Sequence, residues 1–260
     1  MNVPFRLGTT SFIHPGSWVE NVQQLAGRVA DVELLFFESG ELPDDDEVEA
    51  LAAWKQRAEL TYSLHTPLDV SLASTSAARR AAALASVRLA IDTAAPLEPE
   101  VTIVHVYLGE HEHDEHVPAD LGAWRRRAAR SLEALLDSIA PAELCVEILD
   151  YDFALIEPVV IDLGLSVAVD IGHLVRDGRD EKATLLRHLH RTRVVQWHGI
   201  DPSGRDHRGL AHYPRDSARW LFDTLVREAY RGVLTLEVFR AADLDESLAV
   251  VAALAQEQRS

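Results

Sequence analysis

Short apolar segments rich in β-branched residues recur eight times along the chain, and stretches with helical spacing separate them. The segments span residues 5–10, 31–38, 60–66, 101–106, 142–147, 166–170, 193–198 and 232–237. Runs of this length and composition are typical of parallel strands that are covered on both faces. Eight strand and helix units in 260 residues predict an α/β fold, a single (β/α)8 TIM barrel, because an open doubly wound sheet usually has about five or six strands.

The intervening segments place apolar side chains on one face of a helix. The clearest sets are Val19, Val22, Leu25 and Val29, then Trp124, Ala128, Leu132 and Leu135, and finally Leu244, Leu248, Val251 and Leu254. The acidic run at residues 44–49 is typical of a helix start, where acids suit the positive end of the helix dipole. No linker rich in Pro, Gly or Ser divides the chain, so we expect one domain over residues 1–260.

Six of the predicted strands end in a side chain of a type that binds metal ions. These residues are His65, His105, Glu147, Asp170, His198 and Glu237, and His173 follows Asp170 after three positions. The carboxyl ends of barrel strands meet at one mouth, where active sites form. One such side chain alone is more often a hydrogen-bonding group, but their repeated placement predicts a metal centre at that mouth.

These candidates exceed the needs of one ion, because zinc or manganese takes roughly four to six ligands, some of them water. The sequence therefore predicts two or three divalent metal ions with bridging carboxylates. Nitrogen and oxygen donors favour zinc or manganese and are compatible with iron or cobalt. Asp206 and His207, in the loop after the seventh strand, are candidates for a third metal position. Cys145 is expected to be a packing residue deeper in the barrel.

Other polar residues near the mouth are candidates for substrate binding. Arg208 could hold a phosphate through its planar guanidinium, although a surface arginine is equally expected. Arg205 and His212 belong to the same loop, and Glu38 ends the second predicted strand. The tract at residues 109–116 alternates histidines with acids in a spacing that fits no single helix or strand face. We expect that tract to form a solvated loop or lid.

Charge and composition limit the partners and the location. The formal net charge of -17 disfavours nucleic acid, because binding a phosphate backbone requires clustered Lys and Arg. No apolar run approaches the roughly 18 residues of a membrane span. With Cys145 as the one cysteine and no signal-peptide pattern at the start, a cytoplasmic location is expected. No Gly-rich fingerprint follows the first strand, so no NAD is expected. The oligomeric state is left open.

The strand-end residues, in this order, resemble the xylose isomerase-like barrel superfamily, which includes endonuclease IV and sugar epimerases. The residues that match its common metal core are Glu147, Asp170, His198 and Glu237. The segment Asp170-Ile-Gly-His173 is similar to its strand-six motif. The additional His65 and His105 resemble the multi-metal branch, which cleaves phosphodiesters. Endonuclease IV has one residue between its loop Asp and His, whereas Asp206 and His207 are adjacent, so their sharing of one ion stays open.

Three stretches, residues 6–13, 205–212 and 230–239, are similar to the cobamide-remodelling phosphodiesterases of the CbiR family. This resemblance implies a small-molecule substrate, an adenosylated corrinoid. Enzymes of that family cleave the phosphodiester in the nucleotide loop of adenosylated cobamides. The implied products are adenosylcobinamide phosphate and an α-riboside of the lower ligand, and the implied role is cobamide remodelling and salvage.

The resulting hypothesis is metal-assisted hydrolysis. The first ion would be held by His65 and His105, the second by Asp170, His198 and Glu237, and a third by His173 with Asp206 or His207. Glu147 would bridge two ions, and Arg208 would stabilise charge that develops on the phosphate. An alternative is a sugar or keto-acid isomerase or epimerase with one ion, in which a strand-end glutamate such as Glu237 moves the proton. A second alternative is a corrinoid or metal carrier without catalytic activity.

Overall fold

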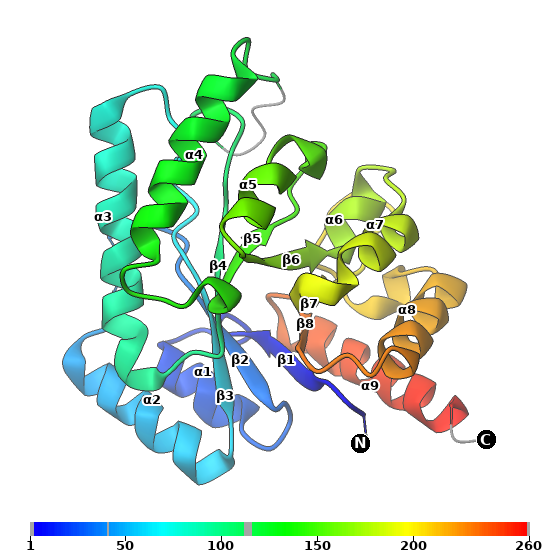
Figure 1. Ribbon diagram of the computed structural model, residues 1–260. Helices are drawn as coiled ribbons and strands as arrows, with labels where there is room; N and C mark the ends of the chain where they lie inside the picture. Colours follow the sequence, from blue (N-terminus) through cyan, green and yellow to red (C-terminus); the bar gives the residue numbers. More distant parts are fainter. Residues whose placement is uncertain (1–2, 41, 112–115, 259–260) are drawn as a thin grey trace.

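Eight parallel strands close into one barrel in the computed structural model, which describes residues 3–40, 42–111 and 116–258 (Figure 1). The strands are β1 (Arg6–Thr10), β2 (Asp31–Leu35), β3 (Thr61–His65), β4 (Val101–Val104), β5 (Leu144–Glu147), β6 (Ser166–Asp170), β7 (Thr192–Trp197) and β8 (Val233–Leu236). They pair in chain order, and β8 closes the barrel by pairing with β1. Each of the eight segments predicted from the apolar pattern overlaps one of these strands, and the predicted TIM-barrel fold is confirmed.

The apolar pattern overestimates the length of β2. The strand ends at Leu35, although the prediction extends it to residue 38. Phe36 still donates its N–H to the His65 carbonyl, 3.0 Å away. The ring of Phe36 packs on Trp18, and Phe37 packs on the ring of Phe12. The apolar run therefore continues from the strand into a loop that is packed by aromatic rings.

Helices cover the outside of the barrel (Figure 1). They are α1 (Trp18–Leu25), α2 (Asp45–Ala58), α3 (Ala77–Ala94), α4 (Leu121–Leu135), α5 (Glu157–Asp162), α6 (Ile171–Arg176), α7 (Glu181–His188), α8 (Arg215–Arg227) and α9 (Ala241–Glu257). The predicted apolar face of α4 is fully buried from Trp124 to Leu135. The acidic run begins α2 as predicted, because the Asp44 side chain caps the helix by accepting from the N–H of Glu47.

The buried side chains form two separate apolar regions. The larger region lies between strands and helices, and a smaller one lies inside the barrel. The inner residues are Val101, Ile103, Cys145, Ala168 and Val194. Cys145 is fully buried there, and burial raises the pKa of its thiol to about 12, which agrees with the predicted packing role.

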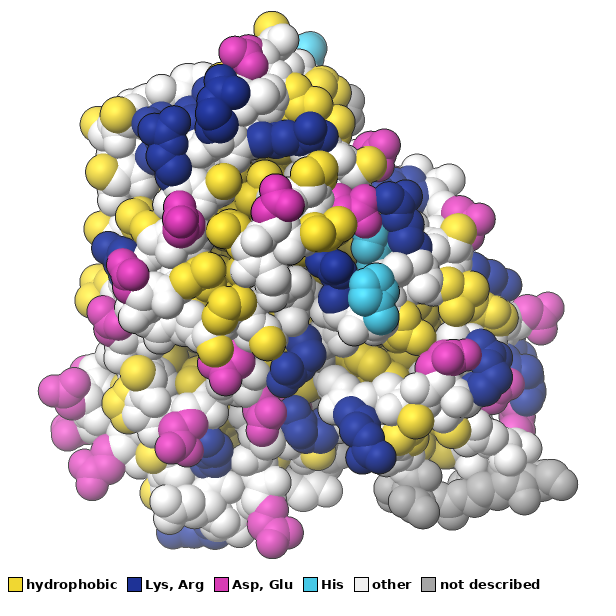
Figure 2. All heavy atoms as spheres, in the orientation of Figure 1, with side chains coloured by type: hydrophobic (Ala, Val, Ile, Leu, Met, Phe, Trp, Pro, Cys, Tyr) yellow, Lys and Arg dark blue, Asp and Glu magenta, His cyan; other side chains and the backbone are white. Residues whose placement is uncertain are grey.

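Figure 2 draws one face of the outer surface, in the orientation of Figure 1. Charged side chains of both signs are spread there between smaller groups of hydrophobic side chains. Within the described ranges, no helix has the length and hydrophobicity that crossing a membrane requires. The predicted tract at residues 109–116 lies partly outside the described residues, since positions 112–115 are not included.

Candidate metal centre

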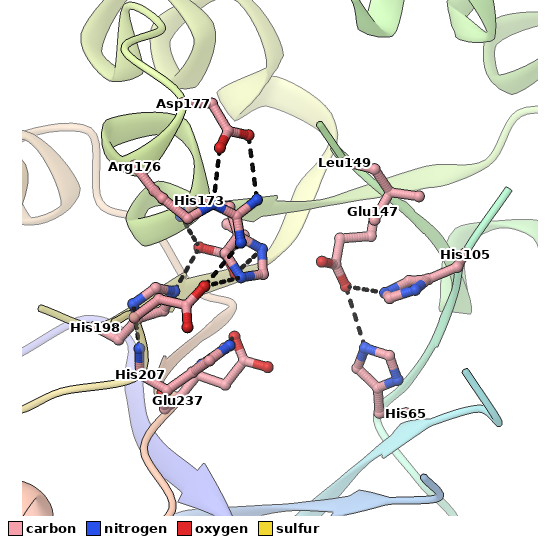
Figure 3. A network of polar contacts seen from close by, with 12 residues as sticks. His65, His105, Glu147, Leu149, His173, Arg176, Asp177, His198, His207 and Glu237 are labelled. Atoms are coloured by element: carbon pink, nitrogen blue, oxygen red, sulfur yellow. Dashed lines mark hydrogen bonds and ion pairs between the residues drawn. The ribbon is translucent and has the colours of Figure 1, made fainter. Parts of the chain in front are cut away.

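The candidate ligands meet because each one ends a strand or directly follows one. The last residues of β3, β5 and β6 are His65, Glu147 and Asp170, and the residues directly after β4, β7 and β8 are His105, His198 and Glu237. All six are buried. Figure 3 shows His65, His105 and Glu147 on one side of the barrel mouth, facing a group that includes His173, His198, His207 and Glu237.

The first side of the mouth is a carboxylate between two imidazoles. Glu147 Oε2 lies 3.1 Å from His65 Nε2 and 3.0 Å from His105 Nε2. Potential ligand atoms of these three residues lie within 4.8 Å of one another. Burial raises the pKa of Glu147, but the two imidazoles outweigh that effect and hold the pKa below its usual range. The carboxyl is therefore ionised at neutral pH.

The other ring nitrogens fix which tautomers the two histidines adopt. The hydroxyl of Tyr107 donates to the Leu68 carbonyl at 2.9 Å, so it accepts from His105 Nδ1–H, 2.8 Å away. His65 Nδ1 lies 3.1 Å from the Thr66 carbonyl and must likewise carry a proton. When the rings are protonated, both Nε2–H groups donate to Glu147 and lower its pKa; when the rings are neutral, both Nε2 lone pairs point at this carboxylate oxygen. Three electron-rich atoms meet here, an arrangement that suits a bound cation.

The second side of the mouth joins Asp170, His198 and Glu237. His198 Nε2 lies 3.3 Å from Asp170 Oδ1, and the three residues form another group with potential ligand atoms within 4.8 Å. Burial raises the pKa of Glu237 well above its usual value, and the negative charge of Asp170 adds to this effect. Without a cation, Glu237 is thus held protonated beside an ionised neighbour.

His173 connects the two sides. Asp170 caps α6 by accepting from the backbone N–H of His173 at 2.8 Å, which brings the two side chains together. His173 Nδ1 lies 2.9 Å from Asp170 Oδ2. Burial lowers the pKa of His173, but the attraction of Asp170 raises it to about 9. Glu147, Asp170 and His173 form a further group of potential ligands, so a carboxylate from each side is within reach of this imidazole.

The loop after β7 brings His207 into the site through a strained backbone. His207 adopts a left-handed conformation with φ 52°, which is uncommon for a residue with a side chain. Its N–H donates to His198 Nδ1 at 3.0 Å, and its Nδ1 lies 3.0 Å from the Glu237 carbonyl. Burial and the neighbouring His198 lower its pKa to about 4. His207 is therefore neutral at pH 7, and it forms a potential ligand group with His173 and His198.

Asp206 has a different environment from its neighbour His207. Its Oδ2 accepts from Arg176 Nη1 at 2.7 Å and lies 3.6 Å from His173 Nε2. Burial raises the pKa of Asp206, but the hydrogen bond from Arg176 outweighs it and lowers the pKa. Among the predicted metal ligands, Asp206 alone belongs to none of the four ligand groups found among the described residues.

The predicted substrate-binding residues do not join these groups. The guanidinium of Arg208 has its Nε 3.3 Å from Asp201 and its Nη1 3.8 Å from Asp243. Arg205 is exposed and paired with Asp201 at 2.9 Å. His212 and Glu38 lie outside these ligand groups as well. The two arginines already have acidic partners.

Three residues that matter for the centre are not among the sequence candidates. Tyr107 orients His105. In the sequence, only its position two residues after His105 could have suggested this contact, and that is a weak signal. Arg176 holds Asp206 and lies one helical turn after His173, a spacing that places both on one helix face. Glu33 lies inside β2 with both carboxyl oxygens buried and without hydrogen-bond partners. An acid inside an apolar strand segment is the signal that could have revealed it.

Several buried polar atoms on the second side of the mouth favour a metal ion there, although Asp170 Oδ2 also lies 2.9 Å from His173 Nδ1. Asp170 Oδ2, His198 Nε2 and Glu237 Oε2 are buried, and none has a hydrogen bond of good geometry. Buried polar atoms in folded proteins normally have a partner, which can be an ion. Two carboxylates and one imidazole are donors that zinc and manganese accept. The side chains present therefore fit the predicted divalent ions.

A family model described as a xylose isomerase-like TIM barrel matches residues 26–255. The chain is similar to the solved structure of a D-tagatose 3-epimerase-like protein, with a TM-score of 0.80, 17% identity and coverage of 98% of this chain and 100% of that chain. It is similar to endonuclease IV from Thermus thermophilus, with a TM-score of 0.71, 19% identity and coverage of 97% and 99%. It is also similar to 3-keto-D-glucoside 4-epimerase from E. coli, with a TM-score of 0.72, 16% identity and coverage of 97% and 99%. No protein of curated function matches the sequence at a significant level. At these identities the structural likeness shows the fold alone.

Proposed function

The chain belongs to the xylose isomerase-like TIM-barrel family, and on that premise we propose that it is a metal-dependent phosphodiesterase. The substrate we propose is an adenosylated cobamide, which is cleaved at the phosphodiester of its nucleotide loop. The products would be adenosylcobinamide phosphate and an α-riboside, as the similarity of three stretches to cobamide-remodelling phosphodiesterases implies. The observation that carries the proposal is the group of His65, His105 and Glu147, which adds a ligand set to the one at β6 to β8.

A second ligand set suits the cleavage of a phosphodiester. Divalent ions bound at the mouth would lower the pKa of a water molecule and withdraw charge from the phosphate oxygens. The protein supplies the geometry for this chemistry. Glu147 lies between the imidazoles of His65 and His105 and within reach of Asp170 and His173, so we assign it the bridging position. On the side formed by Asp170 and His198, Glu237 and His207 would supply further ligands.

Surrounding residues hold these ligands in place. Tyr107 and Thr66 present the Nε2 atoms of the two imidazoles toward the mouth. Arg176 holds Asp206 beside His173. For Arg208 the contacts with Asp201 and Asp243 favour a positioning role, in which it fixes the loop after β7. Contact between Arg208 and the substrate phosphate would require these ion pairs to rearrange.

The test is anaerobic incubation of the metal-loaded protein with adenosylcobalamin, followed by liquid chromatography and mass spectrometry. We expect adenosylcobinamide phosphate and the α-riboside in equal amounts. His105→Ala should lose at least about 100-fold in rate, because metal-assisted steps depend on intact coordination, and it should bind less metal. His190→Ala, which changes a histidine before β7 near the opposite end of the barrel, is the matched control. Full activity and unchanged metal content in the His105 variant would refute the assignment.

A metal-dependent sugar or keto-acid isomerase or epimerase is the second candidate. It is favoured by the group of Asp170, His198 and Glu237, which could hold one ion with Glu147 nearby. In that case a panel of ketohexoses should show turnover with one ion per chain, and adenosylcobalamin should remain intact. A carrier would return the corrinoid unchanged after prolonged incubation with every metal.

A further inference from the structure

One side of the barrel interior carries polar side chains that have no hydrogen bond of good geometry. Glu33 on β2, Gln196 on β7 and Thr235 on β8 are all fully buried. Both carboxyl oxygens of Glu33, both polar atoms of the Gln196 amide and the hydroxyl of Thr235 have no hydrogen bond. Their sequence neighbours pack in the outer core, and these neighbours are Leu34, Val32, Val195, Trp197, Leu234 and Leu236. The alternation along each strand therefore directs the three polar side chains into the barrel.

The three polar side chains lie close to one another. Gln196 and Thr235 are partners in the register of β7 and β8. Burial raises the pKa of Glu33 to about 7, against the lowering effects of His65 and of the Gln196 amide beside it. β1 lies between β8 and β2, where its Gly8 is the register partner of Thr235 and its Thr10 is the register partner of Glu33. Glu33, Gln196 and Thr235 thus surround one region beneath the metal centre.

A neighbouring carboxylate on the same strand, by contrast, has well-formed hydrogen bonds. Asp31, the first residue of β2, is also fully buried. Its Oδ1 accepts from the Ser63 hydroxyl at 2.8 Å, and its Oδ2 accepts from the Thr61 hydroxyl at 2.5 Å. The fold thus gives Asp31 two well-formed hydrogen bonds, whereas Glu33 has only the nearby Gln196 amide and no hydrogen bond of good geometry. Groups such as Glu33 have a partner in native proteins, and where the protein gives none it is water or an ion.

We propose that Glu33, Gln196 and Thr235 bind a monovalent alkali cation, Na⁺ or K⁺. The available donors are a carboxylate, an amide oxygen and a hydroxyl, which are hard oxygen ligands without imidazole or thiolate. A single carboxylate among these donors balances one positive charge. The negative charge of Glu33 acts on both Glu237 and His65, so the cation would offset that charge directly below the divalent centre. This site does not depend on which reaction the mouth catalyses.

The first test follows thermal unfolding of the metal-loaded protein at pH 8. Choline chloride is replaced stepwise by KCl or NaCl at constant ionic strength. We expect a saturable rise in Tm of at least about 3 °C, because a ligand that binds the folded state stabilises it. The cation that acts at the lower concentration is the preferred one. Equal Tm values in choline, Na⁺ and K⁺ would overturn the proposal and leave water or a proton as the partner of Glu33.

Variants distinguish this site from a general salt effect. Glu33→Gln should lose the dependence on the cation, whereas Asp31→Asn, which changes the partnered acid on the same strand, should keep it. Thr235→Val removes one donor with little change in volume and should weaken the dependence, which covers the case that Glu33→Gln does not fold. Retained dependence in a folded Glu33→Gln would place the cation elsewhere. In crystals grown with Tl⁺, anomalous density among Glu33, Gln196 and Thr235 should locate the ion, and its absence there would count against the site.

Discussion

Replacing Tyr107 by phenylalanine should weaken metal binding without changing any ligand. The tyrosine hydroxyl accepts from His105 Nδ1–H at 2.8 Å and donates to the Leu68 carbonyl at 2.9 Å. Its loss leaves the buried His105 N–H without this partner, which costs about 1–3 kcal/mol. The ring is then free to rotate or to change tautomer. Loss of such an orienting bond typically lowers metal affinity about 10- to 100-fold, which corresponds to about 1.4–2.8 kcal/mol.

The assay titrates metal-free protein with Mn²⁺ or Zn²⁺ in competition with a chromophoric chelator. Tyr107→Phe should reduce the affinity of one metal position by the stated factor and leave the others unchanged. Tyr151→Phe is the matched control, because the Tyr151 hydroxyl is also buried but donates to the Val106 carbonyl at 2.7 Å. If Tyr107→Phe loses no more affinity than Tyr151→Phe, the orientation of His105 does not determine metal binding at this position.

Three further predictions concern the other side of the mouth. In the metal-free protein the pKa of His173 is raised to about 9. Its ion pair with Asp170 then stabilises the fold by about 3 kcal/mol. This contribution is complete below pH 6.5 and is lost as the pH rises through 9. The Tm should fall in that window, and the fall should be smaller in His173→Gln. Arg176→Ala releases Asp206 and should lower the affinity of the third metal position about tenfold, as measured by metal content after dialysis, while Arg187→Ala on the surface should not. In Gly172→Ala the new methyl group would lie 2.2–2.5 Å from ring atoms of His198, so the variant should lose one ion per chain, whereas Gly40→Ala, with open space around it, should lose none.

The sequence predicts the fold and most of the centre because both depend on strand ends. Apolar periodicity locates each strand, and barrel closure brings the residues at the carboxyl ends together. For this reason His65 and Glu147 could be placed in one site although 82 positions separate them. Assigning these strand-end residues to one site therefore requires only the positions of the strands, and not the contacts between side chains.

The parts that could not be predicted depend on contacts between side chains. Nothing near Arg208 in the sequence indicates that Asp243, on α9, lies beside its guanidinium. Similarly, Asp206 and His207 are adjacent in sequence, but the left-handed backbone of His207 directs the two side chains to different partners. Glu33 is hidden in an apolar segment because the inner and outer faces of a barrel strand are both buried.

The two principal ligand sets occupy successive stretches of the chain that do not overlap, and this sets the order in which translation completes them. His65, His105 and Glu147 belong to the β3 to β5 region, whereas Asp170, His198 and Glu237 belong to the β6 to β8 region. Every ligand of the first set therefore emerges from the ribosome before β6 does, and the second set stays incomplete until residue 237 has emerged. A metal ion that arrives during synthesis meets the first set first. Pulse-labelling of nascent chains of increasing length with a radioactive metal would record this sequence of loading.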